Sequence, residues 1–271
     1  MIDTRLTGKV ALITGANHGI GAATAIALAA EGVSVFLTYK RLPPLNDPAY
    51  PETYDCNRAG DADDVVGRIR ETGGRAEAVE ADLADPETPK ALFDQAEKAF
   101  GPVEILVNNA SGWLSDTFAP SEHDSFGRPL RPVDAETHDR QFAVDVRAPA
   151  LLIAEFARRH VERGATWGRI IGLTSEGPHG FPSEVSYGAA KSAQESYTMS
   201  AAHELGPYGI TANMVHPPIT DTGWINEEVE KLAATYGPLR SVGRPEDVAE
   251  VITFLASHQG RRVTAQVIKM Y

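Results

Sequence analysis

A glycine-rich turn near the start of the chain places the strongest constraint on its fold. Three glycines stand in the stretch Thr14–Gly21, which follows the apolar run Val10–Ile13 and opens an alanine-rich helical pattern. A glycine turn between a strand and a helix directs backbone N–H groups and the positive end of the helix dipole towards an anion. The sequence therefore predicts a phosphate-binding turn in the first strand–helix unit of an α/β domain.

Short β-branched runs alternate with helical patterns along the 271 residues. This alternation is typical of a parallel sheet covered by helices on both faces. Strands are expected at 9–13, 33–39, 76–80, 103–107, 169–174, 210–215 and 265–268. Helices are expected at 22–31, 61–71, 86–100, 135–161, 184–205, 224–236 and 245–256. We expect one domain, 1–271, with inserted loops at about 41–59 and 111–134 that are longer than ordinary connections.

Charge and composition argue against several classes of protein. The formal net charge of −12 argues against nucleic acid and anionic membranes as partners. The single cysteine, Cys56, excludes an internal disulfide and indicates a reducing compartment or indifference to it. No apolar stretch reaches the length of a membrane span, and the first residues lack the apolar centre of a signal peptide. We expect a soluble cytoplasmic protein without a metal ion.

A second motif, formed by Ser175, Tyr187 and Lys191, carries the candidate chemistry. Tyr187 and Lys191 are four residues apart at the start of an expected helix, so they share one helix face. At about 4 Å and an effective dielectric constant of about 20, the ammonium would stabilise the phenolate by about 4 kcal/mol and lower the tyrosine pKa. Such a tyrosine can act as a general acid or base. Ser175 follows an expected strand, where its hydroxyl can lie beside Tyr187. The alternative is a buried tyrosine beside a lysine that extends to solvent.

In combination, the two motifs resemble those of the short-chain dehydrogenase/reductase family, which has Thr-Gly-x-x-x-Gly-x-Gly near the N-terminus and Ser…Tyr-x-x-x-Lys about two thirds along the chain. Further signatures follow in the family's order: Asp82-Leu83, Asn108–Ser111 and Asn213 to Thr222. The resemblance extends from about Gly8 to about Ile268. It implies a single-domain Rossmann fold with a seven-stranded parallel sheet, a small-molecule substrate, and a homo-oligomer, either a tetramer or a dimer. Within the family, the chain resembles beta-ketoacyl carrier-protein reductases and related ketone reductases.

The resemblance also implies interconversion of a carbonyl and a secondary alcohol by hydride transfer. Tyr187 would be the general acid or base, Lys191 would lower its pKa and bind the nicotinamide ribose, and Ser175 would hydrogen-bond the substrate oxygen. The cofactor would lie against a larger set of residues: Gly15, Asn17, His18, Gly19, Ile20, Gly21, Asp82, Leu83, Asn109, Tyr187, Lys191, Pro217, Ile219 and Thr222. Asp82 has an alternative role as the cap of the next helix.

The end of the second expected strand indicates which nicotinamide cofactor is used. NAD-selective sites of this kind place an acid there, whereas a 2′-phosphate needs a basic group. Tyr39 stands at that position and is followed by Lys40 and Arg41. His18 occupies a position that is often basic in the NADP-using members that the chain resembles. NADP(H) is therefore the expected cofactor; the alternative is that Lys40 and Arg41 only solvate the start of the insertion.

One departure from the family bears on catalysis. Asp145 stands where many members have an asparagine that holds a water connecting the lysine to solvent. Asp145 could accept from such a water, or it could pair with Lys191 and weaken the effect of the lysine on Tyr187. A third possibility is that Arg147 engages Asp145 and leaves the lysine free.

Two questions stay open in the sequence. Trp113, Phe118, Phe181 and Trp224 favour an apolar or ring-bearing substrate, although aromatic residues in loops often serve packing. Asp145 and Pro218, which replaces a usual glycine, leave room for a nucleotide-binding sensor that has lost turnover. The intact set of Ser175, Tyr187 and Lys191 favours the enzyme, because a sensor has no need of a tuned phenol.

Overall fold

Seven parallel strands form the central sheet of the computed structural model, which describes residues 3–175 and 180–271. Their order across the sheet is β3-β2-β1-β4-β7-β8-β9. Their bounds are β1 Val10–Thr14, β2 Ser34–Tyr39, β3 Arg75–Glu80, β4 Ile105–Asn108, β7 Gly168–Leu173, β8 Ile210–His216 and β9 Val267–Lys269. The predicted seven-stranded parallel sheet of a Rossmann fold is thereby confirmed, with strand ends shifted by up to two residues.

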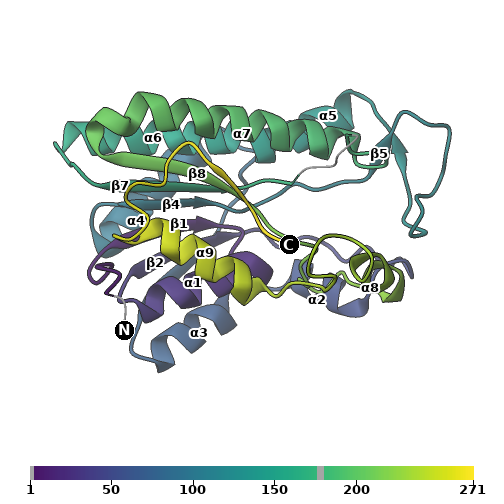
Figure 1. The fold of residues 1–271 in the computed structure, drawn as a ribbon, viewed down its shortest axis with the longest axis horizontal. Coiled ribbons are helices and arrows are strands. Elements are labelled where there is room, and N and C mark those ends of the chain that lie inside the picture. Colours follow the sequence, from purple (N-terminus) through teal and green to yellow (C-terminus); the bar gives the residue numbers. More distant parts are fainter. Residues whose placement is uncertain (1–2, 176–179) are drawn as a thin grey trace.

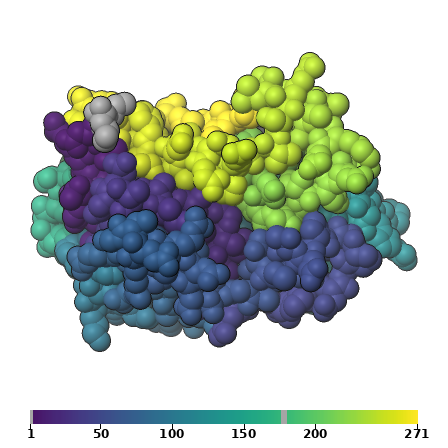
Figure 2. Space-filling view, turned by 90° about the horizontal axis from the view of Figure 1, so that it is seen from below, coloured from purple at the N-terminus to yellow at the C-terminus, as the bar shows by residue number. Residues whose placement is uncertain are grey.

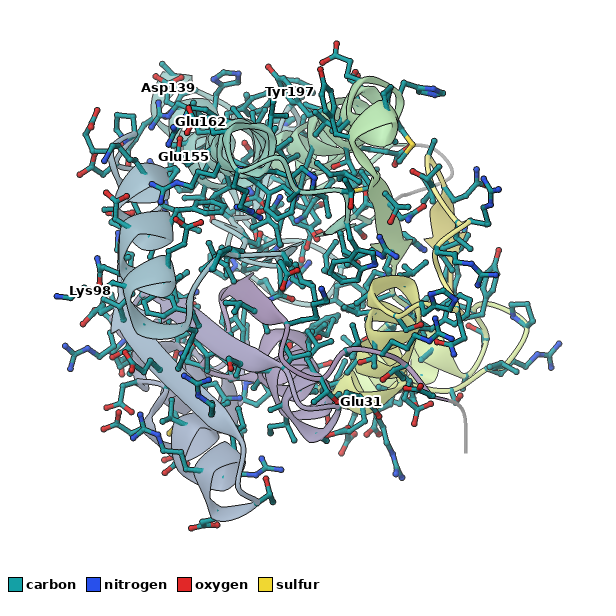
Figure 3. All side chains as sticks on the ribbon, turned by 90° about the vertical axis from the view of Figure 1, so that its left-hand side faces the viewer. Glu31, Lys98, Asp139, Glu155, Glu162 and Tyr197 are labelled. Carbon is teal, nitrogen blue, oxygen red and sulfur yellow. The ribbon has the colours of Figure 1, made fainter. Side chains whose placement is uncertain are left out.

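Helices cover both faces of the sheet (Figure 1). One face carries α1 Gly19–Ala30, α3 Asp63–Glu71 and α9 Pro245–Ala256, and the other carries α4 Thr88–Phe100, α6 Ala148–Glu162 and α7 Val185–Leu205. Lys98 of α4 and Glu162 of α6 lie on the outer surface of this second layer (Figure 3). In the described part of the chain, each helix is too short or too polar to cross a bilayer.

The first strand shows why both faces are apolar. Val10 and Leu12 pack into one buried cluster, whereas Ala11 and Ile13 pack into the other. Successive side chains of a strand point to opposite faces, so a strand that is covered twice needs an unbroken apolar run.

The strand order places a crevice at the carboxyl end of β1. This strand pairs with β2 on one side, at Thr14 and Thr38, and with β4 on the other, at Ile13 and Val107. The connections that follow β1 and β4 therefore diverge to opposite sides of the sheet. Open α/β sheets bind their ligands at such a switch point.

The first insertion is not the loop that its prolines predict, because Glu52–Ala59 forms a helix, α2. Pro51 stands at the N-cap of α2, where its missing N–H costs nothing, so proline begins this helix instead of excluding it. Acidic residues in the first turn and Arg58 in the last turn suit the helix dipole. Seen from below, the dark blue segment containing α2 borders the yellow-green segment containing α8, Glu227–Ala233 (Figure 2).

The expected helix 135–161 is also different, because it is divided. It consists of α5, Ala135–Phe142, a π-helical turn, Ala143–Arg147, and α6. Pro149 lacks the N–H that would bond to the carbonyl of Asp145, which favours the wider turn. The second insertion contains a small two-stranded sheet, β5 Asp116–Thr117 and β6 Arg131–Pro132.

Candidate active site

A cavity of about 710 Å³ opens at the carboxyl edge of the sheet. It brings together most of the predicted site residues: Gly15, Asn17, His18, Gly19, Ile20, Lys40, Asp82, Leu83, Asn109, Ser175, Tyr187, Lys191, Pro217, Ile219 and Thr222. Three predicted residues do not line it. Gly21 lies within the glycine turn, Arg41 is directed towards Glu80, and Asp145 is fully buried beside Lys191.

The glycine turn is held tightly against the end of β4. A Cβ on Gly15, where φ is +64°, would lie 2.8 Å from the Cα of Ala110, and a Cβ on Gly21 would lie 2.3 Å from the carbonyl oxygen of Gly15. Asn109 Nδ2 donates to the carbonyl oxygens of Thr14 and Gly15, at 2.9 and 2.8 Å. Glycine is therefore required by sterics at both positions, and Asn109 fixes the shape of the turn.

The start of α1 fits a phosphate group. His18 occupies the N-cap position, and its side chain makes no capping hydrogen bond to the first turn. The first N–H groups of a helix have no partner within the helix, so they stay available to an anion. The buried Nδ1 of His18 has no hydrogen-bond partner among the described residues.

The basic residues after β2 both form ion pairs with acids of the neighbouring strand and the segment after it, and their role at the cofactor stays a prediction. Lys40 lines the cavity but its ammonium lies 2.5 Å from a carboxylate oxygen of Asp82. Arg41 binds Glu80 of β3 through both Nε and Nη2 and is half exposed. The sequence did not reveal these pairs because the acids follow or end a strand about forty residues later, and only the parallel pairing of β2 with β3 brings them alongside.

Arg58, on α2, is a cavity residue that the sequence did not indicate. Burial first, and then the nearby charge of Arg58, hold the pKa of His18 below its ordinary value. The imidazole is therefore a neutral partner at neutral pH, and Arg58 supplies the positive charge beside it. Arg58 was missed in the sequence because the insertion was predicted to be a loop, whereas Arg58 lies on a helix within it.

Ser175, Tyr187 and Lys191 meet at the floor of the cavity, as predicted. The side chains of Ser175 and Tyr187 are hydrogen-bonded. Lys191 is buried; its Nζ donates to the carbonyl oxygen of Leu173 at 3.1 Å and lies 5.6 Å from the centre of the Tyr187 ring. These contacts join the end of β7 to the first turns of α7.

The pKa of Tyr187 differs from the sequence expectation, because it is raised above its ordinary value. Burial is the largest cause, followed by the negative charges of Asp145 and Glu184. Lys191 does not reverse this, because its Nζ lies 3.1 Å from Oδ1 of Asp145. An ammonium compensated by a carboxylate exerts little net field on a third group.

Asp145 is held rigidly in the π-helical turn. Its Oδ2 accepts hydrogen bonds from the backbone N–H of Gly112 at 2.6 Å and from Nε2 of Gln141 at 2.7 Å. Its Oδ1 faces Lys191 in an ionic contact without hydrogen-bond geometry. Arg147 instead donates to the carbonyl oxygen of Ala84, so the alternative in which Arg147 neutralises Asp145 is wrong.

The second insertion anchors the start of the helix that carries Tyr187. Asp116 of β5 is fully buried and accepts from the backbone N–H of Ser186 at 2.8 Å and from the Ser186 hydroxyl. A carboxylate at a helix N-terminus is stabilised by the free N–H groups and the dipole. Seventy residues separate the partners, so sequence spacing gave no sign of this contact.

Aromatic side chains form the outer walls of the cavity. Trp113 and Trp224 line it as expected, but Phe118 is 81% exposed and Phe181 packs edge-on against Tyr187, with ring centres 5.7 Å apart. The structure adds four tyrosines that the sequence did not indicate: Tyr50, Tyr54, Tyr236 and Tyr271. Tyr50 stacks on Tyr54 and meets Trp113 edge-on, at 5.5 and 6.2 Å between ring centres, so both insertions contribute to one wall.

Comparisons with known proteins agree with this geometry. The family models described as "Enoyl-(Acyl carrier protein) reductase" and "short chain dehydrogenase" match residues 53–270 and 9–49. Elsinochrome reductase 1 of Elsinoe fawcettii is 35% identical, over 98% of this chain and 94% of its own. A short chain dehydrogenase of Burkholderia cenocepacia, crystallised with NADP, has a TM-score of 0.81 at 30% identity, covering 98% of this chain and 97% of that one. The angucycline C-6 ketoreductase LanV, crystallised with bound NADP, has a TM-score of 0.78 at 30% identity, covering 97% and 94%.

These matches span nearly the whole chain and coincide with the glycine turn and with the meeting of Ser175, Tyr187 and Lys191. The chain therefore belongs to the short-chain dehydrogenase/reductase family.

Proposed function

We propose that this protein is an NADP(H)-dependent oxidoreductase that interconverts a carbonyl and a secondary alcohol. The observation that carries the proposal is the meeting of Ser175, Tyr187 and Lys191 in the cavity that also contains the glycine turn. The NADP complexes of similar structures support the cofactor, and the reductases among the relatives support the reaction class. The glycine turn and the first turn of α1 would hold the diphosphate, and Pro217, Ile219 and Thr222 would border the nicotinamide.

The reaction divides the work between cofactor and protein. When bound, the nicotinamide supplies or accepts the hydride. Tyr187 transfers the proton to or from the substrate oxygen, and Ser175 hydrogen-bonds that oxygen. Lys191 binds the nicotinamide ribose, and Asp145 fixes the position of Lys191 through their ionic contact. The Tyr187 phenol is protonated at neutral pH, as an acid in carbonyl reduction must be, although its raised pKa makes it a weaker proton donor than an ordinary tyrosine.

A ring-bearing ketone is the substrate class that the cavity fits best. Tyr50, Trp113 and Trp224 line the cavity and offer flat apolar faces with polar edges. Such faces bind aromatic rings by offset stacking or edge-to-face contact. The relatives named elsinochrome reductase and angucycline C-6 ketoreductase agree with this class.

Nucleotide binding followed by turnover tests the proposal. Fluorescence titration is expected to show NADPH bound at least about tenfold more tightly than NADH, a difference of about 1.4 kcal/mol. The protein is then expected to oxidise NADPH in the presence of fused-ring ketones. The rate with linear beta-ketoacyl esters should be lower. Tight NADPH binding without turnover of any ketone would contradict the enzyme and favour the sensor.

The pH dependence should reveal the influence of Asp145 on Tyr187. In Asp145→Asn, the negative charge near the phenol is lost and Lys191 is no longer neutralised, so the pKa of Tyr187 falls. Reduction requires the protonated phenol, so kcat/KM should begin to fall at a pH about one unit lower than in the wild type, equivalent to about 1.4 kcal/mol. The amide oxygen that replaces the carboxylate in this variant can still accept from the N–H of Gly112. Because the variant leaves Lys191 buried without its carboxylate, a lower melting temperature is expected, and thermal melting is measured beside the pH profile.

The matched control is Asp139→Asn, which removes an acid from the outer surface of α5 (Figure 3). This variant should leave the pH profile unchanged. If Asp145→Asn folds normally and keeps the wild-type profile, the charge of Asp145 does not control the phenol.

A further inference from the structure

The inserted helix α2 brings a basic residue into the cavity. Arg58 lies in the last turn of α2, and its side chain lines the cavity together with His18 and Lys40. The guanidinium lies 5.4 Å from the centre of the Tyr54 ring, which supports it from one side. The backbone carbonyl oxygen of Arg58 accepts a hydrogen bond from the N–H of Leu42 at 2.8 Å, which connects Arg58 to the segment that follows β2.

The position of α2 relative to the glycine turn is fixed by hydrogen bonds. Nδ2 of Asn17, inside the turn, donates to the carbonyl oxygens of Asn57 and Gly60 at 3.2 and 3.0 Å. Nδ2 of Asn57 donates to the carbonyl oxygen of Thr222 at 3.1 Å. The residue that follows Asn57 is therefore held near the glycine turn by contacts on two sides.

Arg58 differs from its basic neighbours in its partners. Lys40 and Arg41 are neutralised by Asp82 and Glu80, whereas among the described residues Arg58 has no ion-pair partner within 4.0 Å. Its Nε is buried without a hydrogen-bond partner in the described part of the chain. The carboxylate of Asp55 accepts hydrogen bonds from the backbone N–H groups of Leu45 and Asn46. It interacts with Arg58 only electrostatically, without a direct contact. A buried N–H donor of a charged group lowers the stability of a protein unless an anion accepts a hydrogen bond from it.

We propose that Arg58 binds the 2′-phosphate of NADP(H), which makes the inserted segment the determinant of cofactor selectivity. The proposal rests on the proposed function only in requiring a nicotinamide cofactor in this cavity. Arginine presents a planar fork of donors that matches phosphate oxygens, and the neutral imidazole of His18 offers a further hydrogen-bonding partner beside it. Lys40 and Arg41 then serve to join β2 to β3 and to the segment after it, a structural role.

Equilibrium binding of NADPH and NADH to purified variants tests this assignment without depending on turnover. Arg58→Leu is expected to weaken NADPH binding by about 10- to 100-fold, the usual worth of a charge-assisted hydrogen bond, and to change NADH binding by less than about threefold. Arg58→Lys keeps the charge without the fork, so its loss should be intermediate. Arg68→Leu, which removes an exposed arginine of α3, and Arg41→Leu should both keep the preference for NADPH.

Each other outcome has a definite meaning. Equal weakening of NADPH and NADH by Arg58→Leu would overturn the assignment, because both cofactors share the diphosphate. If Arg41→Leu alone lost the preference for NADPH over NADH, the 2′-phosphate would be bound by Arg41 at the end of β2 and not by Arg58. Wild-type protein that binds the two cofactors equally but reduces ketones would refute this inference and leave that reaction standing, whereas binding of neither would refute both. Thermal melting of Arg58→Lys and Arg58→Leu shows whether a weaker affinity reflects misfolding.

Discussion

Replacement of Tyr187 by phenylalanine is expected to reduce kcat for carbonyl reduction by about 10²- to 10⁴-fold, the usual contribution of a positioned proton donor. The phenyl ring keeps the contact with Phe181 and the packing at the start of α7, so the protein should fold normally. NADPH affinity should change by less than about threefold, because the glycine turn and Lys191 are untouched. Steady-state kinetics and fluorescence titration on the same preparation measure the two effects separately.

Tyr197→Phe is the matched control for this variant. Tyr197 lies on the same helix but on the outer surface, with 51% of the residue exposed (Figure 3). The two substitutions remove the same hydroxyl group from α7, and only the first should reduce turnover. Wild-type turnover in Tyr187→Phe would show that another group supplies the proton.

Replacement of Lys191 by methionine is expected to have the largest effect on stability. Lys191 and Asp145 are 3% and 0% exposed, and Lys191→Met leaves the carboxylate buried without its cation. Breaking a buried pair from one side costs about 3–5 kcal/mol, a large share of the stability of a typical domain. Urea unfolding measures the loss of stability, and turnover should fall as well, because the proposed ribose contact and the ammonium are lost together.

The double variant Lys191→Met with Asp145→Asn separates the two causes. Removing the orphaned charge should restore much of the stability without restoring turnover. Lys231→Met, which breaks an exposed pair with Glu228, should unfold like the wild type. If Lys191→Met were as stable as the wild type, the ionic contact with Asp145 would not contribute to the fold.

The elements that local pattern defines were predicted well. The apolar runs Val10–Ile13 of β1 and Ile105–Val107 of β4 identified buried parallel strands, because a strand covered on both faces has no polar side. The glycine turn and the spacing of Tyr187 and Lys191 located the two halves of the site, because both are short-range motifs on defined elements. The proline-rich stretch before α2 misled the prediction, since Pro51 can begin a helix as well as interrupt a strand.

The electrostatics of the site could not be predicted in the same way. A four-residue spacing places Lys191 near Tyr187, but it does not show that Asp145 lies 3.1 Å from the same ammonium. Burial, together with a carboxylate at that distance, reverses the expected effect on the phenol, because the pKa of Tyr187 depends on desolvation and on the sum of all nearby charges. The ion-pair partners of Lys40 and Arg41 were also missed, because they too lie far away in the chain and close only in the folded structure.

The sequence by itself determined the strands of the sheet, the glycine turn and the residue types proposed for catalysis, because each depends on residues close together in the chain. Only the tertiary structure decided which charges neutralise one another and which stay available. It placed Arg58 beside His18 and Asp116 at the start of α7, through contacts between segments 40 and 70 residues apart. The protonation of Tyr187 and the proposed site for the 2′-phosphate depend on those long-range contacts, since charges act through space and not along the chain.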